Sequence, residues 1–119
     1  MGRPAARPRV DWYYHRPGCS TCIRADVFLE EGRIEVVERV PASRRLQASD
    51  ALRFIGQSAR LWTAKGRAVN RFVLADGQPP AAILPHMLGP TGNLRAPLLR
   101  IGDLCLVGFN ADLFAEAFS

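Results

Sequence analysis

The alternation of hydrophobic and polar positions divides the start of the chain into two strands and a helix. Val10–Tyr14 is rich in aromatic and β-branched residues, which predicts a first strand. Apolar residues then recur at helical spacing over Ser20–Glu31, and Gly32 supplies a stop. Ile34–Val40 predicts a second strand. Because a helix connects them, we expect the two strands to be parallel, in a right-handed βαβ unit.

The middle of the chain has a weaker pattern. A second helix is expected over Ser49–Gln57, with Ser49 or Asp50 near its cap. Leu61–Leu74 fits either two short strands around a turn at Lys65-Gly66 or one irregular helix, and both interpretations stay open. A loop, a short helix and a second loop are then expected at Asp76–Pro80, Ala81–Leu88 and Gly89–Asn93.

The last third predicts a hairpin followed by a helix. Pro97–Ile101 and Leu104–Val107 flank a two-residue turn, with Gly102 where a type II′ turn requires glycine. Asn110 should cap a final amphipathic helix. The order β-α-β-α, then α-β-β-α, is that of a thioredoxin fold. We therefore expect an α/β domain with a four-stranded mixed sheet and helices on both faces.

Length and composition fit one globular domain in a soluble protein. The chain has 119 residues, of which 48% are hydrophobic and 23% are charged. No apolar run approaches the roughly 20 residues that a membrane span needs. The N-terminus lacks the apolar centre of a signal peptide, so we expect a cytoplasmic protein that does not engage a membrane. A disordered tail is expected over residues 1–8 and the thioredoxin-like domain over residues 9–119.

The positive charge of the chain does not by itself indicate a nucleic-acid partner. The net charge is +5, and all but one of the 16 basic residues are arginines, which are scattered along the sequence. This pattern is typical of a base-composition bias in the genome. No basic stripe interleaved with aromatic residues is visible, so direct binding of nucleic acid is not expected.

Two cysteines three residues apart open the first predicted helix. Unpaired backbone N–H groups and the helix dipole at such a position stabilise a thiolate, which is the form of cysteine that attacks. Cys19 is therefore the candidate nucleophile, and His15 and Arg16 just upstream could add positive potential. Cys22 is placed as the resolving thiol, which would close a Cys19–Cys22 disulfide.

Two alternatives to redox chemistry stay open for this pair. Either the two cysteines have no redox role, or they form half of a structural zinc site. The remaining zinc ligands would come from His15, His86 and Cys105, which share no ligand-like spacing, so no metal is expected. Cys105 alternates within a predicted strand and should be a buried, inert thiol. His86 is expected on the surface of its helix.

Pro97 and Arg95 are candidate substrate-binding residues. A proline that opens a strand after a loop is compatible with a cis peptide, here Ala96-Pro97. In thioredoxin folds such a proline lies opposite the thiol-bearing helix and helps to form the substrate groove. Arg95 could point toward Cys19 and bind an anionic substrate, or it could be an ordinary surface arginine.

Three segments together resemble the arsenate reductase and Spx branch of thioredoxin-fold proteins, the ArsC family. They are Gly18-Cys19-Ser20-Thr21-Cys22 followed by Arg24-Ala25, then Leu94-Arg95-Ala96-Pro97-Leu98-Leu99, and Val107-Gly108-Phe109-Asn110. The resemblance implies that Cys19 is the nucleophile and that Cys22 forms a redox-switch disulfide with it. The arginine that precedes the proline in arsenate reductases is replaced here by Ala96, and their further arginine after the fourth strand has no match.

The residues and the resemblance leave several functions to weigh. The first is a thiol–disulfide oxidoreductase acting on a protein or small-molecule disulfide, with no bound cofactor. An external thiol system, glutathione with glutaredoxin or thioredoxin, would recycle it. The second is an Spx-like redox-sensing regulator that contacts RNA polymerase. The third is a glutaredoxin-coupled arsenate reductase, and the last is a family member whose thiols no longer cycle.

Overall fold

The computed structural model describes residues 9–74, 77 and 79–119. The predicted tail, residues 1–8, lies outside the described residues, and so does part of the predicted loop Asp76–Pro80. The helices are α1 Ser20–Glu31, α2 Ala48–Gln57, α3 Pro80–Met87 and α4 Ala111–Ala117. The strands are β1 Arg9–Val10, β2 Trp12–His15, β3 Glu35–Val36, β4 Arg39–Pro41, β5 Arg60–Lys65, β6 Ala68–Val73, β7 Leu98–Ile101 and β8 Leu104–Val107.

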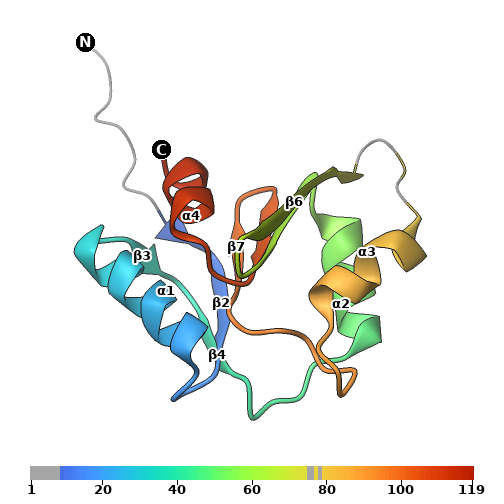
Figure 1. Cartoon of the computed structure of the whole chain (residues 1–119), viewed down its shortest axis with the longest axis horizontal. Helices are drawn as coiled ribbons and strands as arrows, with labels where there is room; N and C mark the ends of the chain where they lie inside the picture. The colour runs from blue at the N-terminus through green and yellow to red at the C-terminus, as the bar shows by residue number, and fades with distance from the viewer. Residues whose placement is uncertain (1–8, 75–76, 78) are drawn as a thin grey trace.

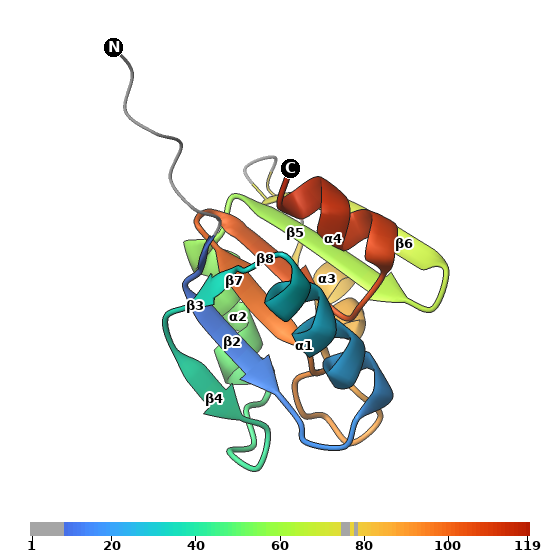
Figure 2. The same ribbon diagram turned by 90° about the vertical axis from the view of Figure 1, so that its left-hand side faces the viewer.

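The described strands form a mixed sheet of six and a separate pair. The order in the large sheet is β4-β2-β7-β8-β5-β6, and β1 pairs with β3 (Figure 2). The parallel pairing of β2 with β4 through α1 confirms the predicted βαβ connection. The antiparallel pair β7 and β8 confirms the C-terminal hairpin, with Gly102 at φ +57° in its turn.

The expected four-stranded sheet was wrong, because the middle of the chain adds two strands. Of the two interpretations of Leu61–Leu74, the strands are correct: β5 and β6 form an antiparallel hairpin whose turn contains Gly66 at φ +61°. β5 also pairs in parallel with β8, which makes it an interior strand. An interior strand is buried on both faces and therefore shows a continuous apolar run, which periodicity alone cannot distinguish from a buried helix.

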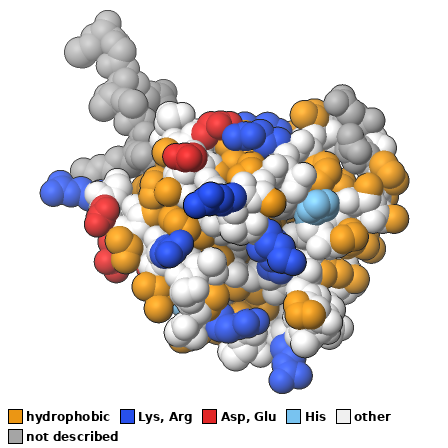
Figure 3. Space-filling view, viewed as in Figure 1, with side chains coloured by type: hydrophobic (Ala, Val, Ile, Leu, Met, Phe, Trp, Pro, Cys, Tyr) orange, Lys and Arg blue, Asp and Glu red, His pale blue; other side chains and the backbone are white. Residues whose placement is uncertain are grey.

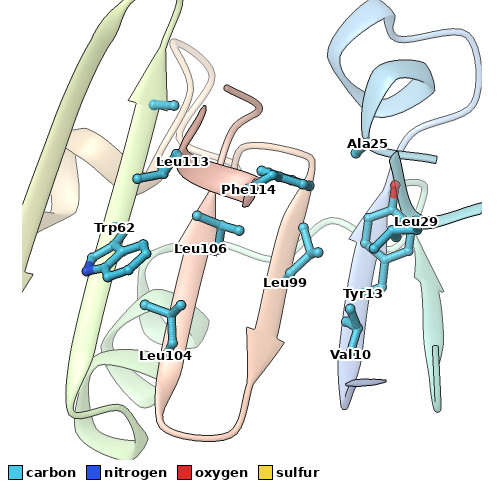
Figure 4. Close-up of a cluster of buried hydrophobic side chains, with 11 residues drawn as sticks. Val10, Tyr13, Ala25, Leu29, Trp62, Leu99, Leu104, Leu106, Leu113 and Phe114 are labelled. Carbon is cyan, nitrogen blue, oxygen red and sulfur yellow. The ribbon is translucent and has the colours of Figure 1, made fainter. Parts of the chain in front are cut away.

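Helices cover both faces of the sheet. Figures 1 and 2 show α1 and α4 on one face and α2 and α3 on the other. A hydrophobic core lies on each face of the sheet, and successive side chains of a strand belong to opposite cores. Leu99 and Leu106 point toward α1 and α4, whereas Leu98 and Cys105 point toward α2 and α3. The first core is drawn in Figure 4, where Tyr13, Leu29, Trp62, Leu99, Leu104, Leu106, Leu113 and Phe114 come together.

Element boundaries differ from the prediction at three places. Each of the first two predicted strands is split into two short ones, the first at Asp11, whose carboxylate accepts a hydrogen bond from the N–H of Gly102 at 2.8 Å. The cap of α2 is Gln47 rather than Ser49 or Asp50, and Asp50 instead accepts from the Gln47 N–H at 2.9 Å. The predicted caps at Gly32 and Asn110 are confirmed. No helix in the described part of the chain is long and apolar enough to span a membrane.

Candidate functional site

Cys19 lies at the mouth of α1. Gly18 reaches a left-handed φ of +78°, and Cys19 then takes the N-cap position with extended backbone, φ −80° and ψ 129°. Its carbonyl accepts the N–H of Ile23 at 2.9 Å, while its side chain makes no capping hydrogen bond. The sulfur is therefore not used to close the helix end, and Cys19 is partly exposed.

The immediate surroundings of Cys19 favour its thiolate. Burial of the side chain acts against the charge, but hydrogen bonds outweigh it, and the pKa of Cys19 is lowered from its ordinary value. The Thr21 hydroxyl contributes most, at 3.1 Å from the Cys19 sulfur, followed by the backbone and side chain of Cys22. The sequence analysis assigned no role to Thr21, although its place inside the Cys-x-x-Cys segment is a signal that could have found it.

Cys22 is the opposite kind of thiol. It is 1% exposed, one turn into α1, and its sulfur accepts the backbone N–H of Arg16 at 3.3 Å. Burial, together with the neighbouring Cys19 and Asp26, raises the pKa of Cys22 to about 12 against the lowering effect of the Arg16 N–H. Cys19 is therefore the more exposed of the two residues and has the lowered pKa, whereas Cys22 is buried and its raised pKa keeps the thiol protonated at neutral pH.

We expect this difference to appear in the pH dependence of alkylation. A lowered pKa means that the Cys19 thiolate forms at lower pH, so the rate with iodoacetamide should reach half of its maximum at a lower pH than that of a cysteine in a short unstructured peptide measured alongside. Thr21→Val keeps the shape of the side chain and removes the hydroxyl. It should move the profile to higher pH and slow the reaction at pH 7 by up to about tenfold.

The control for this prediction is Ser20→Ala. It removes the hydroxyl of an exposed neighbour at the first position of the same helix. If the Thr21→Val and Ser20→Ala profiles coincide, the contact between Thr21 and Cys19 does not set the pKa of Cys19.

A buried polar group supports the helix behind Cys22. The Tyr13 hydroxyl donates to the Asp26 carboxylate at 2.8 Å and lies 3.5 Å from the Cys22 carbonyl oxygen. Burial and the hydrogen bond to Asp26 raise the pKa of Tyr13, which keeps the phenol protonated. Arg39 forms an ion pair with Asp26 at 3.7 Å and lies over the Tyr13 ring at 5.3 Å. These contacts tie α1 to β2 and β4, and they place Cys22 against the sheet.

A cleft of about 890 Å³ opens beside the mouth of α1. Thr21, whose hydroxyl contacts the Cys19 sulfur, lines this cleft together with Arg16, Lys65 and Arg95. Figure 3 shows one face of the molecule, over which lysine and arginine side chains are spread, while the acidic side chains in view lie toward the upper left. The cleft therefore brings a basic surface next to Cys19.

Arg95 is half-buried and held in place. Its guanidinium donates to the Ala64 carbonyl at 2.7 Å and to the His86 carbonyl at 3.1 Å. Burial lowers the pKa of Arg95 from its ordinary value. Gly108, at φ +82°, lies against this contact, since a Cβ there would overlap the Ala64 carbonyl oxygen and lie 3.1 Å from the Arg95 guanidinium. Glycine at this position lets the arginine reach β5, a role that the sequence analysis missed.

The expected cis peptide between Ala96 and Pro97 is confirmed. Pro97 is buried, its carbonyl accepts the N–H of Gly108 at 2.8 Å, and its neighbours Arg95 and Ala96 line the cleft. The roles of Arg95 and Pro97 in substrate binding stay predictions.

The other candidate residues take structural places. Cys105 is fully buried in the core beneath α2 and α3, where burial raises its pKa to about 12, as expected of an inert thiol. His86 is partly exposed on α3 and its ring lies 5.2 Å from that of Phe72. Within residues 9–74, 77 and 79–119, no group of three or more His, Cys, Asp or Glu side chains could hold a metal ion.

The site thus combines an acidic, accessible thiol, a buried second thiol in the next turn and a basic cleft. Comparison with known proteins adds no family to this description, because no protein-family model matches the chain and no curated protein matches it.

Proposed function

We propose that the protein is a thiol–disulfide oxidoreductase of thioredoxin-like architecture, in which Cys19 is the nucleophile and Cys22 the resolving thiol. The observation that carries the proposal is the difference between the two thiols. Cys19 is partly exposed with a lowered pKa, whereas Cys22 is buried with a raised one. Thiol–disulfide exchange needs this combination, because the first thiol must attack as a thiolate and the second must wait until a mixed disulfide has formed.

The arrangement of the elements supports the thioredoxin-like part of the proposal. β2, α1, β4, α2, β7, β8 and α4 follow one another in the order of that fold, and the strands lie in the order β4-β2-β7-β8. The β5–β6 hairpin and α3 are then additions beside β8 and beneath the sheet. The resemblance to the ArsC family supports the same proposal through the motifs around Cys19, Pro97 and Gly108.

The proposed reaction proceeds in two steps. The Cys19 thiolate attacks one sulfur of a substrate disulfide, so that a Cys19–substrate bond forms while the substrate S–S bond breaks and its other sulfur leaves as a thiolate. Cys22 then gives up its proton to solvent, and its thiolate attacks the Cys19 sulfur and releases the second substrate thiolate. The enzyme ends as a Cys19–Cys22 disulfide. Two electrons have passed to the substrate, and its two thiolates take up protons from solvent.

The substrate class in this proposal is a protein or small-molecule disulfide. No bound cofactor takes part, and a cytoplasmic thiol system, glutathione with glutaredoxin or thioredoxin, reduces the pair again. The contacts of Arg95 favour a disulfide over arsenate, because both ends of its guanidinium donate to backbone carbonyls and the position before Pro97 is Ala96.

A redox titration tests the proposal. The chain is equilibrated in glutathione buffers of increasing oxidised fraction, free thiols are blocked, and disulfides are identified by peptide mapping. A Cys19–Cys22 bond should form in a single two-electron transition while Cys105 stays reduced. The same titration in urea is the control, since unfolding exposes all three thiols. If the folded chain gives no Cys19–Cys22 bond at any ratio, or pairs Cys105 as readily, the proposal fails.

A further inference from the structure

We infer that the substrate of the thiol pair is an acidic polypeptide segment whose cysteine is presented to Cys19 along a basic groove. This inference rests on the proposed function and adds the class of substrate. The basic groove consists of the 890 Å³ cleft beside α1 and an adjoining cleft of about 580 Å³, which share Arg16, Thr91 and Asn93 in their linings.

The charge of the groove is of one sign. Arg16, Lys65 and Arg95 line the first cleft, and Arg16 and Arg45 line the second. Among the residues that the structure describes, neither lining contains an aspartate or a glutamate. Arg16, Arg45 and Lys65 are exposed, and none of them forms one of the ion pairs found in the described part of the chain. Their charges are therefore available to carboxylates of a bound partner.

The size of the groove and the spread of its charges favour a polypeptide over a small oxyanion. A tetrahedral anion requires donors that converge on one point, whereas these cations are distributed over the linings of two adjoining clefts. A volume of 890 Å³ is at the upper end of what a drug-sized ligand fills. Several carboxylates along an extended segment would match both the extent and the distribution of charge.

The position of Cys19 relative to the groove explains how such a segment would react. Thr21 lines the first cleft and its hydroxyl lies 3.1 Å from the Cys19 sulfur. A segment in the groove therefore contacts Thr21, whose hydroxyl touches the sulfur of the nucleophile at the mouth of α1. The exchange itself is the two-step reaction given above, with the disulfide of the acidic peptide as the oxidant.

Three synthetic peptides that differ only in the residues flanking one cysteine test the inference. The flanks are glutamates, glutamines or lysines, and the cysteine carries a neutral 2-thiopyridyl disulfide, whose release is followed by absorbance. At about 0.01 M ionic strength the acidic peptide should react with the reduced protein at least about tenfold faster than the neutral one, and the basic peptide should be slowest. At 0.15 M the advantage should shrink to a few-fold, because salt screens exposed charges.

Charge-removing variants locate the effect. Lys65→Gln combined with Arg45→Gln should remove most of the ratio between the acidic and neutral rates. Arg24→Gln combined with Arg33→Gln is the matched control, because it removes two charges from exposed residues that line neither cleft. Equal ratios in the wild type and the double variant, or equal loss in the control, would overturn the inference.

Failure of the inference can be told apart from failure of the proposed function. If all three peptides react at one rate and that rate depends on Cys19, the oxidoreductase stands and the acidic preference is wrong. If no reaction depends on Cys19, the proposed function fails and the groove is tested by binding alone. A fluorescent acidic peptide with serine in place of cysteine should still bind the protein, as measured by fluorescence anisotropy. Absence of binding, or displacement by micromolar inorganic phosphate, contradicts a groove built for an acidic polypeptide.

Discussion

Cys19→Ser should lower the rate of disulfide reduction by at least about a thousandfold, because the hydroxyl that replaces the thiol does not ionise near neutral pH and cannot form the mixed disulfide. The rate is measured with the neutral 2-thiopyridyl peptide under excess protein, so that one turnover is followed. Cys19 caps α1 through its backbone and not through its side chain. The fold should therefore survive, with an unchanged circular dichroism spectrum.

Cys22→Ser separates the two steps of the proposed reaction. The variant should still release 2-thiopyridone once, and it should then accumulate a covalent Cys19–peptide adduct that mass spectrometry identifies. Cys105→Ser serves as the control thiol substitution, since Cys105 is fully buried on the other face of the sheet. Should Cys19→Ser retain its activity, or should the adduct in Cys22→Ser form at Cys105, the assignment of the nucleophile is wrong.

Gly108→Ala should destabilise the protein by about 3 kcal/mol, which combines the cost of a left-handed backbone with that of an overlap that the backbone must relieve. Gly108 has φ +82°, and a Cβ there would overlap the Ala64 carbonyl oxygen, which is the group that accepts from Arg95. Because the obstacle is backbone of β5, a side-chain rotation cannot relieve it. Urea unfolding followed by tryptophan fluorescence measures the loss.

Gly92→Ala is the matched control for the steric part of this prediction. Gly92 has φ +81° and no heavy atom within 4 Å of the position of an added Cβ. It carries the same backbone cost without the overlap, so we expect a loss of only about 1 kcal/mol. If the two variants unfold at the same urea concentration, contact between Gly108 and β5 does not contribute to stability.

Local features of the fold were predictable from the sequence where the residues that determine them lie within a few positions of one another. The helix after the first cysteine, the turn at Gly102 and the cap at Asn110 all depend on neighbours in the sequence, and the structure confirms them. The cap of α2 was misplaced because an acidic residue is common both at the N-cap of a helix and at its third position, N3. Asp50 occupies N3 of a capping box, and the N-cap is Gln47. The boundary of a helix is the part that such signals locate least well.

The sheet was harder to predict, because the same apolar run suits more than one partner. Leu61–Ala64 is buried on both faces, so it lacks the alternation that identifies a strand with one exposed face. Only its pairing with β8 on one side and β6 on the other makes it a strand of a six-stranded sheet.

The candidate site also has a part that could be predicted from the sequence and a part that could not. Cys19 and Cys22 could be named from the sequence, because their spacing and their place at a helix start are local properties. The two interpretations of Arg95 could not be separated, since its neighbours in the sequence do not include Ala64 or His86, whose carbonyls hold it. Lys65 received no role for the same reason: it reaches the cleft through the β5–β6 hairpin.

Sequence alone thus determined the position of the thiol pair, Cys19 at the start of a helix that follows a short strand and Cys22 three residues later. The tertiary structure decided which thiol is accessible and that basic side chains from separate segments line one groove beside it. The physical reason is the distance along the sequence over which the interactions act. Helix starts, caps and turns depend on residues a few positions apart, whereas the burial and pKa of a group depend on residues from distant segments that pack around it.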